Sequence, residues 1–311
     1  MPAPFLTRRA ALTGAAALPF VASLPRIAGA KADKLGAATA RINRFSLGDF
    51  EVTTMLTGSR TVPDPHGIFG LNASDAEFAA AAAANFIPAD RAQFFFTPTI
   101  VNTGAELVLF DTGTDPDSLL AALAAAGYAP EQVDLVVLTH MHPDHIGGMM
   151  AGGAPTFANA RYATGAVEHN FWSGQANEGF DTLVKPVNDK TSFLDDGGSP
   201  APGITAHLAA GHTPGHMIYR LSSAGSDLLI TADTANHYVW SLAYPDWEVK
   251  FDADKAAAAA ARKQVFGMLA ADRLPFVGYH MPFPAVGYVE AQGAGFRYVP
   301  TSYQMMLEPA G

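Results

Sequence analysis

Four side chains that bind metals well lie within six residues of one another near the middle of the chain. The segment 139–148 reads Thr-His-Met-His-Pro-Asp-His-Ile-Gly-Gly, and its candidate ligands are His140, His142, Asp144 and His145. Neutral imidazole and carboxylate are ligands of zinc and its first-row neighbours. A single histidine is usually a core residue with a hydrogen-bond partner, but four such groups in one loop are hard to explain without a metal.

The spacing within this loop favours two metal ions over one. His140 and His142 alternate and can point to one side, whereas Asp144 and His145 turn toward a second point. One ion rarely takes four ligands with good geometry from so short a loop. Two ions need more ligands than the loop contains, so we expect others elsewhere in the chain.

The loop follows the apolar run 135–138, which is short and β-branched and predicts a buried strand. The glycine pair 147–148 lets the chain turn tightly after it. Three more candidates, His212, Asp233 and His280, each stand at the end of a predicted strand beside a Gly or Pro turn. One oxygen of the Asp233 carboxylate could bridge two ions. The predicted ligands are therefore His140, His142, Asp144, His145, His212, Asp233 and His280.

Other side chains are expected to support the ligands or the substrate. Asp111 ends a predicted strand before a Gly turn, and it either orients a ligand histidine or forms an Asx turn. His216 follows His212 at an offset that favours a supporting or structural role over ligation. Trp172, on a predicted short helix, either walls an apolar substrate pocket or packs in the core.

The elements that must position these residues are short strands and helices. We expect a Pro- and Gly-rich loop over 61–72 and one strand over 94–102. The capping box Ser74–Glu77 predicts the start of an Ala-rich helix, and Asp252 is expected to cap a long helix over 253–271. The segment 177–202 is rich in turn residues and is interpreted as an ordered excursion or a lid.

The first 30 residues have the features of a bacterial Tat signal peptide. Arg8 and Arg9 precede an apolar run that ends at a small-x-small cleavage site, 28–30. The alternative is a membrane anchor, but two prolines interrupt the run, which is shorter than the ~20 residues a span needs. We therefore expect residues 31–40 to be a linker, 41–311 to be one domain, and the protein to be periplasmic or secreted.

Composition excludes several classes of protein. The chain of 311 residues has no cysteine, so disulfides, Cys-type zinc sites and a catalytic thiol are excluded. Its hydrophobic content of 49% is sufficient for a large core. The formal net charge of −10 argues against nucleic acid as a partner, because binding a phosphate backbone requires a basic surface.

The motifs together resemble the metallo-β-lactamase superfamily. The His-x-His-x-Asp-His loop, the Gly-His-Thr-Pro-Gly-His segment at 211–216, the later Asp and the last strand-end His occur in the superfamily's order over nearly the whole mature chain. Segments at 47–52, 171–172, 280–284 and 295–300 are similar to the methyl parathion hydrolase-like subfamily. The resemblance implies an α+β fold, a four-layer αβ/βα sandwich with two central mixed sheets flanked by helices.

The resemblance also divides the ligands between two divalent ions, which are expected to be Zn²⁺. His140, His142 and His212 would bind one ion, Asp144, His145 and His280 the other, with Asp233 between them. Asp144 and Asp233 would be the catalytic carboxylates, and Phe171, Trp172 and Phe180 would line the substrate pocket. Relatives in the subfamily are dimers, so the resemblance implies a homodimer.

Paired metals predict a hydrolase in which a metal-bridging hydroxide attacks a small neutral ester, lactone or phosphotriester. The sequence departs from the methyl parathion hydrolase-like pattern after Asp111–Gly113, where the segment is polar and lacks an aromatic that would line the pocket. The resemblance therefore favours lactone or aryl ester cleavage over organophosphate triesters as the main activity. The alternative hypotheses are a β-lactamase, a nucleic-acid-processing enzyme, an iron redox enzyme and a non-catalytic metal-binding protein. The last would need closed coordination, whereas seven ligands for two ions leave room for water and substrate.

Overall fold

The computed structural model describes residue 33 and residues 36–307. The expected signal, with Arg8, Arg9 and the cleavage segment 28–30, lies outside these residues. Met1–Ala38 and Thr39–Gly311 form two separate units, and the second contains all the elements below. Within the described part of the chain, no helix is both long enough and apolar enough to cross a membrane.

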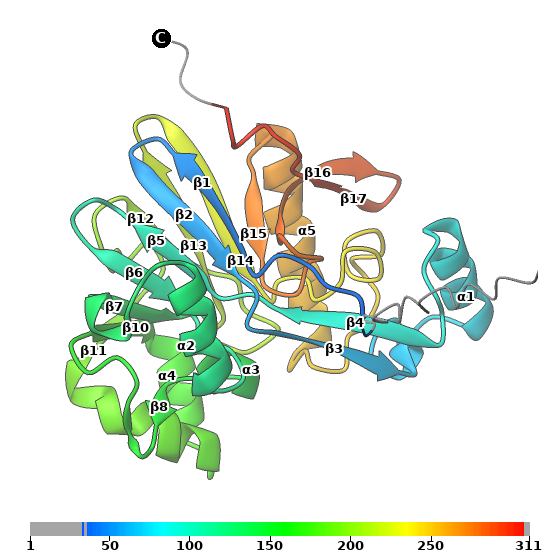
Figure 1. Cartoon of the computed structure of the whole chain (residues 1–311). Helices are drawn as coiled ribbons and strands as arrows, with labels where there is room; N and C mark the ends of the chain where they lie inside the picture. Colours follow the sequence, from blue (N-terminus) through cyan, green and yellow to red (C-terminus); the bar gives the residue numbers. More distant parts are fainter. Residues whose placement is uncertain (1–32, 34–35, 308–311) are drawn as a thin grey trace, which may run out of the picture. The chain divides into compact units, whose positions relative to one another are not determined.

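The first sheet has seven strands in the order β1-β2-β5-β6-β7-β10-β11 (Figure 1). Strands β6, β7, β10 and β11 run parallel to one another, so the carboxyl ends of neighbouring strands meet at the same edge. The bounds are β1 (Ile42–Leu47), β2 (Phe50–Met55), β5 (Thr99–Asn102), β6 (Leu107–Phe110), β7 (Leu135–Leu138), β10 (Arg161–Gly165) and β11 (Thr191–Leu194).

The second sheet has six strands in sequence order, β12 to β17. Only β14 and β15 are parallel within it, so Asp233 and His280 follow strands that end side by side. The bounds are β12 (Ile204–Leu208), β13 (Met217–Ser223), β14 (Ser226–Ala232), β15 (Phe276–Gly278), β16 (Val286–Gln292) and β17 (Gly295–Pro300).

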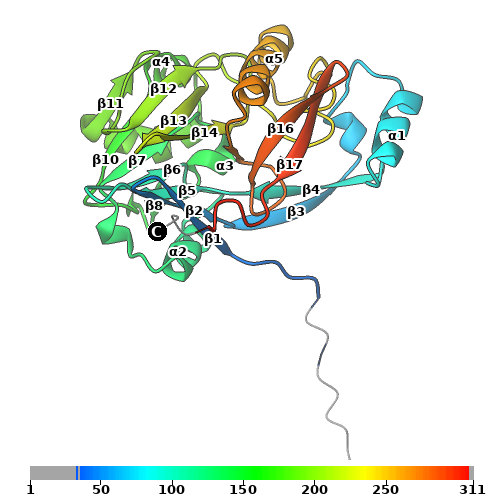
Figure 2. The ribbon, with the colours of Figure 1, turned by 90° about the horizontal axis from the view of Figure 1, so that it is seen from above.

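The two sheets face each other across a core and carry helices on their outer faces, α2 on one side and α5 on the other (Figure 2). Val108 and Val137 of the first sheet pack against Tyr219 and Ile230 of the second. Helix α2 (Pro116–Ala125) covers the outside of the first sheet, and α5 (Lys255–Asp272) covers the outside of the second. This is the four-layer sandwich that the resemblance implies, and the fold prediction is confirmed.

A long two-stranded ribbon, β3 (Gly58–Pro63) with β4 (Arg91–Phe96), extends from the sheets toward α1 (Asp75–Ala84). The capping box expected at Ser74 is present. The loop expected over 61–72 was wrong in part, because β3 continues to Pro63. The single strand expected over 94–102 was also wrong: Pro98 cannot donate to a ladder, and the chain passes there from the ribbon into the first sheet.

The remaining elements are short. They are η1 (Pro65–Gly67), η2 (Pro130–Gln132), α3 (Pro143–Ile146), β8 (Met150–Ala151), β9 (Ala154–Pro155), α4 (Ala166–Ser173), η3 (Phe180–Val184) and η4 (Lys185–Lys190). The last two lie within the segment 177–202, which is ordered and continues into β11 at the edge of the first sheet.

One local expectation is corrected. The long helix is capped by Asp254, whose side chain accepts from the Ala257 N–H at 2.9 Å, so Asp252 is not the cap. The chain does turn at the glycine pair after α3, and both glycines also pack against the backbone of the loop that follows β6. A Cβ on Gly147 would lie 2.2 Å from the Thr114 carbonyl oxygen, and one on Gly148 would lie 2.2 Å from that of Thr112.

Leu109 tests how much the hydrophobic core between the first sheet and α2 contributes to stability. Its side chain is fully buried between β6 and α2. Leu109→Ala should lower the free energy of unfolding by about 2–5 kcal/mol, because it leaves a cavity that the neighbours fill only partly. Urea denaturation measures the change. Leu208, which is 44% exposed, is the control, and Leu208→Ala should cost about 0.5 kcal/mol or less. Equal losses in the two variants would contradict this packing.

Candidate metal centre

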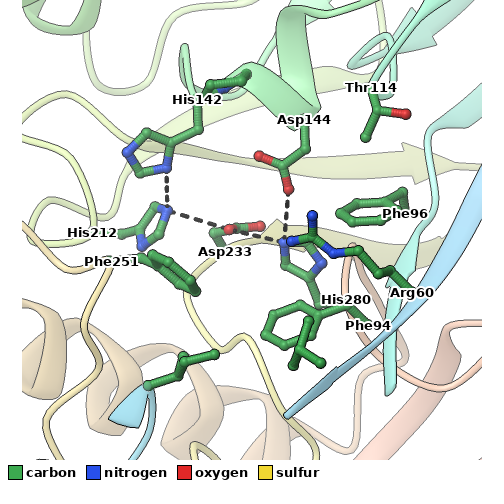
Figure 3. A pocket seen from close by; sticks show the side chains of 13 residues that line it. Arg60, Phe94, Phe96, Thr114, His142, Asp144, His212, Asp233, Phe251 and His280 are labelled. Atoms are coloured by element: carbon green, nitrogen blue, oxygen red, sulfur yellow. Dashed lines mark hydrogen bonds and ion pairs between the residues drawn. The ribbon is translucent and has the colours of Figure 1, made fainter. Parts of the chain in front are cut away.

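All seven predicted ligands lie at one edge between the two sheets, each just beyond a strand. His140 and His142 follow β7, and Asp144 and His145 stand on α3, which begins directly after them. The other three come from the ends of β12, β14 and β15 in the second sheet. Figure 3 shows His142, Asp144, His212, Asp233 and His280 converging on one space.

The first group comprises His140, His142, His212 and Asp233, whose ligand atoms all lie within 4.8 Å of one another. The Nε2 atom of His212 is 3.2 Å from Nε2 of His140 and 2.9 Å from Nδ1 of His142. The latter two nitrogens are 3.1 Å apart. Three ring nitrogens this close cannot all be satisfied by hydrogen bonds among themselves, because each bond needs one donor and one acceptor. A cation between them would satisfy all three.

The second group comprises Asp144, His145 and His280, also with ligand atoms within 4.8 Å of one another. Asp233 lies between the two groups. Its Oδ1 is 3.2 Å from Nε2 of His145, and its Oδ2 is 3.2 Å from Nε2 of both His212 and His280. The grouping therefore corresponds to the division that the resemblance implies.

Two buried atoms indicate that the arrangement fits metal ions. Nε2 of His145 and Oδ1 of Asp233 lie 3.2 Å apart but form no hydrogen bond with each other or with any other described residue, although both are fully shielded from solvent. Leaving a buried polar atom unpaired costs about 1–3 kcal/mol. Imidazole nitrogens and carboxylate oxygens aimed at shared points are the donor set of a zinc-type site, so the residues fit two divalent ions.

Buried carboxylates hold two of these side chains in place. Asp111 accepts from the Thr139 N–H at 2.8 Å and from Nδ1–H of His145 at 2.8 Å, which leaves Nε2 of that ring free to face the site. Asp252 does the same for His212, because its Oδ1 lies 3.0 Å from Nδ1 of that ring. Asp252 also forms a buried ion pair with Arg262. Such contacts fix the orientation of a metal-binding imidazole.

Backbone groups hold two more of the residues. His280 donates from Nδ1 to the Phe95 carbonyl at 2.8 Å. His216 accepts from the Asp233 N–H at 3.1 Å, and its other ring nitrogen is 3.2 Å from the Ala209 carbonyl. Burial lowers the pKa of His216 to about 3, so this ring is neutral. The structure thus places Asp111 and His216 in contact with ligand residues, in the positions expected of supporting side chains.

Glu168 connects the two loops that carry the first group. Its side chain is fully buried at the start of α4 and accepts four hydrogen bonds. One oxygen accepts from the Met141 N–H at 3.0 Å and from the Trp172 indole at 2.6 Å. The other accepts from the Thr213 hydroxyl at 2.6 Å and from the Gly215 N–H at 3.1 Å. Met141 lies between His140 and His142, so this carboxylate links their loop to the loop of His212.

Sequence reasoning missed the roles of Glu168 and Asp252. Asp252 precedes a helix and has the pattern of an N-cap, which concealed its contact with His212. Glu168 is one acid on a short helix, and nothing in its sequence neighbours indicates four buried partners. Only the strand-end position of Asp111 gave a local signal for a supporting carboxylate.

A cavity of about 390 Å³ opens onto both ligand groups. His142, Asp144, His212, Asp233 and His280 form its floor, and Thr114 and Pro143 stand beside them. Its walls are mostly apolar side chains from the ribbon, from the loop that follows it and from the segment before α5, namely Val62, Ile68, Phe94, Phe96 and Phe251. The cavity can therefore hold a small molecule with an apolar body next to the ligands.

The aromatic residues expected to line the pocket lie elsewhere. Phe180 is 3% exposed and packs in the core outside the first sheet. Trp172 packs at the margin of the same core, with its ring 5.9 Å from that of His142 and its indole bonded to Glu168. Phe171 stacks edge-on against Trp172 and is absent from the cavity wall. The aromatic wall comes from β4 and Phe251 instead.

Comparison with known proteins identifies the family. The model of the metallo-beta-lactamase superfamily matches residues 97–275. The chain belongs to this superfamily. A curated relative, an N-acyl homoserine lactonase of Bacillus cereus, is 26% identical over 136 residues, which cover 43% of this chain and 51% of that protein. The match thus spans about half the length of the curated relative.

Solved structures of the superfamily match over more of the chain. The dizinc quorum-quenching lactonase AidC, in complex with the product N-hexanoyl-L-homoserine, has a TM-score of 0.78 and 26% identity, covering 85% of this chain and 98% of its own. The hydrolase AbOPH has a TM-score of 0.77 at 24% identity, covering 86% and 100%. At that identity, the likeness to AbOPH shows the fold alone.

Glu168 gives a test of how the first ligand group is held. Glu168→Ala should weaken zinc binding at the first ligand group by about 10–100-fold, because the two ligand loops lose their shared acceptor. Glu168→Gln keeps one acceptor oxygen, so its zinc affinity should lie between those of the wild type and Glu168→Ala. Titration against a competing chelator measures the affinity. The exposed Glu178 provides the control variant, Glu178→Ala, which should bind zinc as the wild type does. Wild-type affinity in Glu168→Ala would refute the positioning role.

Proposed function

We propose that this chain is a metal-dependent hydrolase that holds two divalent ions, most suitably Zn²⁺, and cleaves lactone or aryl ester bonds. The observation that carries the proposal is the arrangement of seven ligand side chains in two adjoining groups beneath a cavity of about 390 Å³. Similarity to lactonases of the same superfamily supports it, including one solved with a hydrolysed acyl-homoserine product.

The chemistry divides between the ions and the two carboxylates. Two divalent ions, when bound, lower the pKa of a water between them and polarise the carbonyl under attack. Asp233, whose side chain is 4% exposed, spans both groups and fixes their spacing. Asp144 is more accessible, at 26%, and lines the cavity, so its carboxylate is placed to orient the attacking water and accept its proton.

The cavity walls favour a substrate with an apolar portion. Phe94, Phe96 and Phe251 shield the ligands from bulk water and offer contact area to an acyl chain or an aryl ring. Thr114 is the residue that the loop after Asp111–Gly113 contributes to the wall, and it is polar and small. The aromatic surface is therefore confined to β4 and Phe251, and this supports lactones and esters over bulky aryl phosphotriesters.

Removing one ligand of the second group tests the two-ion arrangement. His280→Ala and Asp144→Ala should each lower bound zinc toward one equivalent per chain and abolish most of the activity, because His280 and Asp144 serve the same group. Elemental analysis of purified protein gives the stoichiometry. His207, a half-buried histidine near Asp196, provides the matched control, and His207→Ala should keep two equivalents of zinc. Two retained equivalents with full turnover in either variant would rule out the arrangement.

Chelation and substrate comparison test the activity itself. Dialysis against a strong chelator should abolish turnover, and added zinc should restore it. On the reconstituted enzyme, kcat/KM for an acyl-homoserine lactone or an aromatic lactone should exceed that for an aryl phosphotriester by about tenfold or more, which is ~1.4 kcal/mol of transition-state preference. A phosphotriester ahead of both lactones would instead make organophosphate cleavage the main activity.

A further inference from the structure

The alternation of side chains along β3 places one cationic side chain, Arg60, in the wall of the metal cavity. In the ribbon, Arg60 is paired with Phe94, and residues directly opposite each other on antiparallel strands point to the same face. Arg60 and Phe94 both line the cavity over the ligands, whereas Thr61 and Gln93 line a separate cavity on the other face of the ribbon. The direction of Arg60 thus follows from the period of the strand.

Arg60 forms no ion pair among the described residues, although Asp144 and Asp233 line the same cavity. Its guanidinium forms no ion pair or side-chain hydrogen bond with any residue in 33 or 36–307. Figure 3 shows the side chain extending from the ribbon over the ligand residues. Apart from the ligands themselves, it is the charged group among the described lining residues, and the side chains around it are apolar or aromatic.

An unpaired arginine on an exposed ribbon is often only a solubility device. Two features distinguish Arg60 from that case. It stands in the wall of a concave site, and the two carboxylates on the floor, Asp144 and Asp233, would be neutralised by the ions they hold. The loaded cavity would then be positive, within a chain of net charge −10. Such a local field concentrates anions at the site.

We propose that Arg60 binds a carboxylate carried by the substrate, so that the preferred substrate is an ester or lactone whose apolar portion ends in a carboxylate. This inference rests on the proposed hydrolase function. The scissile carbonyl lies over the ligand groups, the apolar spacer follows Phe94 and Phe96, and the carboxylate reaches the exposed guanidinium. A carboxylate matches the planar fork of arginine with two parallel hydrogen bonds, whereas an amide carbonyl offers one oxygen.

Two esters that differ only at the far end of the acyl chain test this assignment. Phenyl hexanoate ends in a methyl group, and monophenyl adipate ends in a carboxylate. The zinc-reconstituted wild type should prefer the adipate ester by about tenfold in kcat/KM, the effect of one charge-assisted pair. In Arg60→Met this preference should disappear, and in Arg60→Lys part of it should remain. Added salt should reduce it in the wild type.

Arg91 supplies the matched control. It lies on the partner strand of the same ribbon, is exposed, and is absent from the metal cavity lining. Arg91→Met removes the same charge from the same ribbon and should keep the wild-type preference. A preference lost equally in both variants would show a general effect of net charge and overturn the proposal, as would an unchanged preference in Arg60→Met.

Binding of the two free acids, adipate and hexanoate, measured by calorimetry, tests the carboxylate site independently of hydrolysis. Adipate should bind the zinc-loaded protein about tenfold more tightly than hexanoate, and Arg60→Met should remove the difference. If neither ester is cleaved but this difference is found, the hydrolase proposal fails for esters and the carboxylate site stands. If esters are cleaved while adipate and hexanoate bind equally, the carboxylate site is refuted and the hydrolase function stands.

Discussion

The centre depends on a buried carboxylate that is surrounded by imidazoles. Asp233 is 3% exposed, and ring nitrogens of His145, His212 and His280 lie 3.2 Å from its oxygens. Burying a charge in this way is costly unless it is paired and hydrogen-bonded. The Asn236 amide donates to Oδ2 of Asp233 at 2.8 Å and satisfies only part of the carboxylate. Two cations between Asp233 and the surrounding rings would complete its coordination.

The rest of the fold brings strand ends from both sheets to this carboxylate. Parallel pairing of β6 with β7 places Asp111 beside the loop of His140, and parallel pairing of β14 with β15 places Asp233 beside His280. Glu168 and Asp252 then hold the loops with charge-assisted hydrogen bonds. In a chain without cysteine, these buried acids connect segments that are distant in sequence. Asp111 and Asp252 also fix which nitrogen of His145 and of His212 faces the site.

Much of the site was predictable because its signals are local. A strand followed by a ligand and a Gly or Pro turn is visible in the sequence, and it identified the seven residues that the structure brings together. Asp111 carried the same signal. Glu168 did not, because a single acid on a helix gives no indication of four partners from other loops.

The cavity wall was less predictable because it depends on tertiary pairing. The segment 58–63 reads Gly-Ser-Arg-Thr-Val-Pro and has no clear apolar alternation, so its pairing with β4 could not be anticipated. That pairing decides that Phe94 and Phe96, rather than Phe171 and Phe180, face the ligands. Arg60 faces them for the same reason. The ribbon's part of the cavity wall thus follows from the register of its two strands.

Anomalous diffraction from crystals of the zinc-loaded protein, recorded at the zinc absorption edge, tests the central claim most directly. The account predicts two peaks per chain: one among His140, His142 and His212, the other among Asp144, His145 and His280, with Asp233 contacting both. A single peak at full zinc saturation, or a second peak away from Asp233, would contradict it.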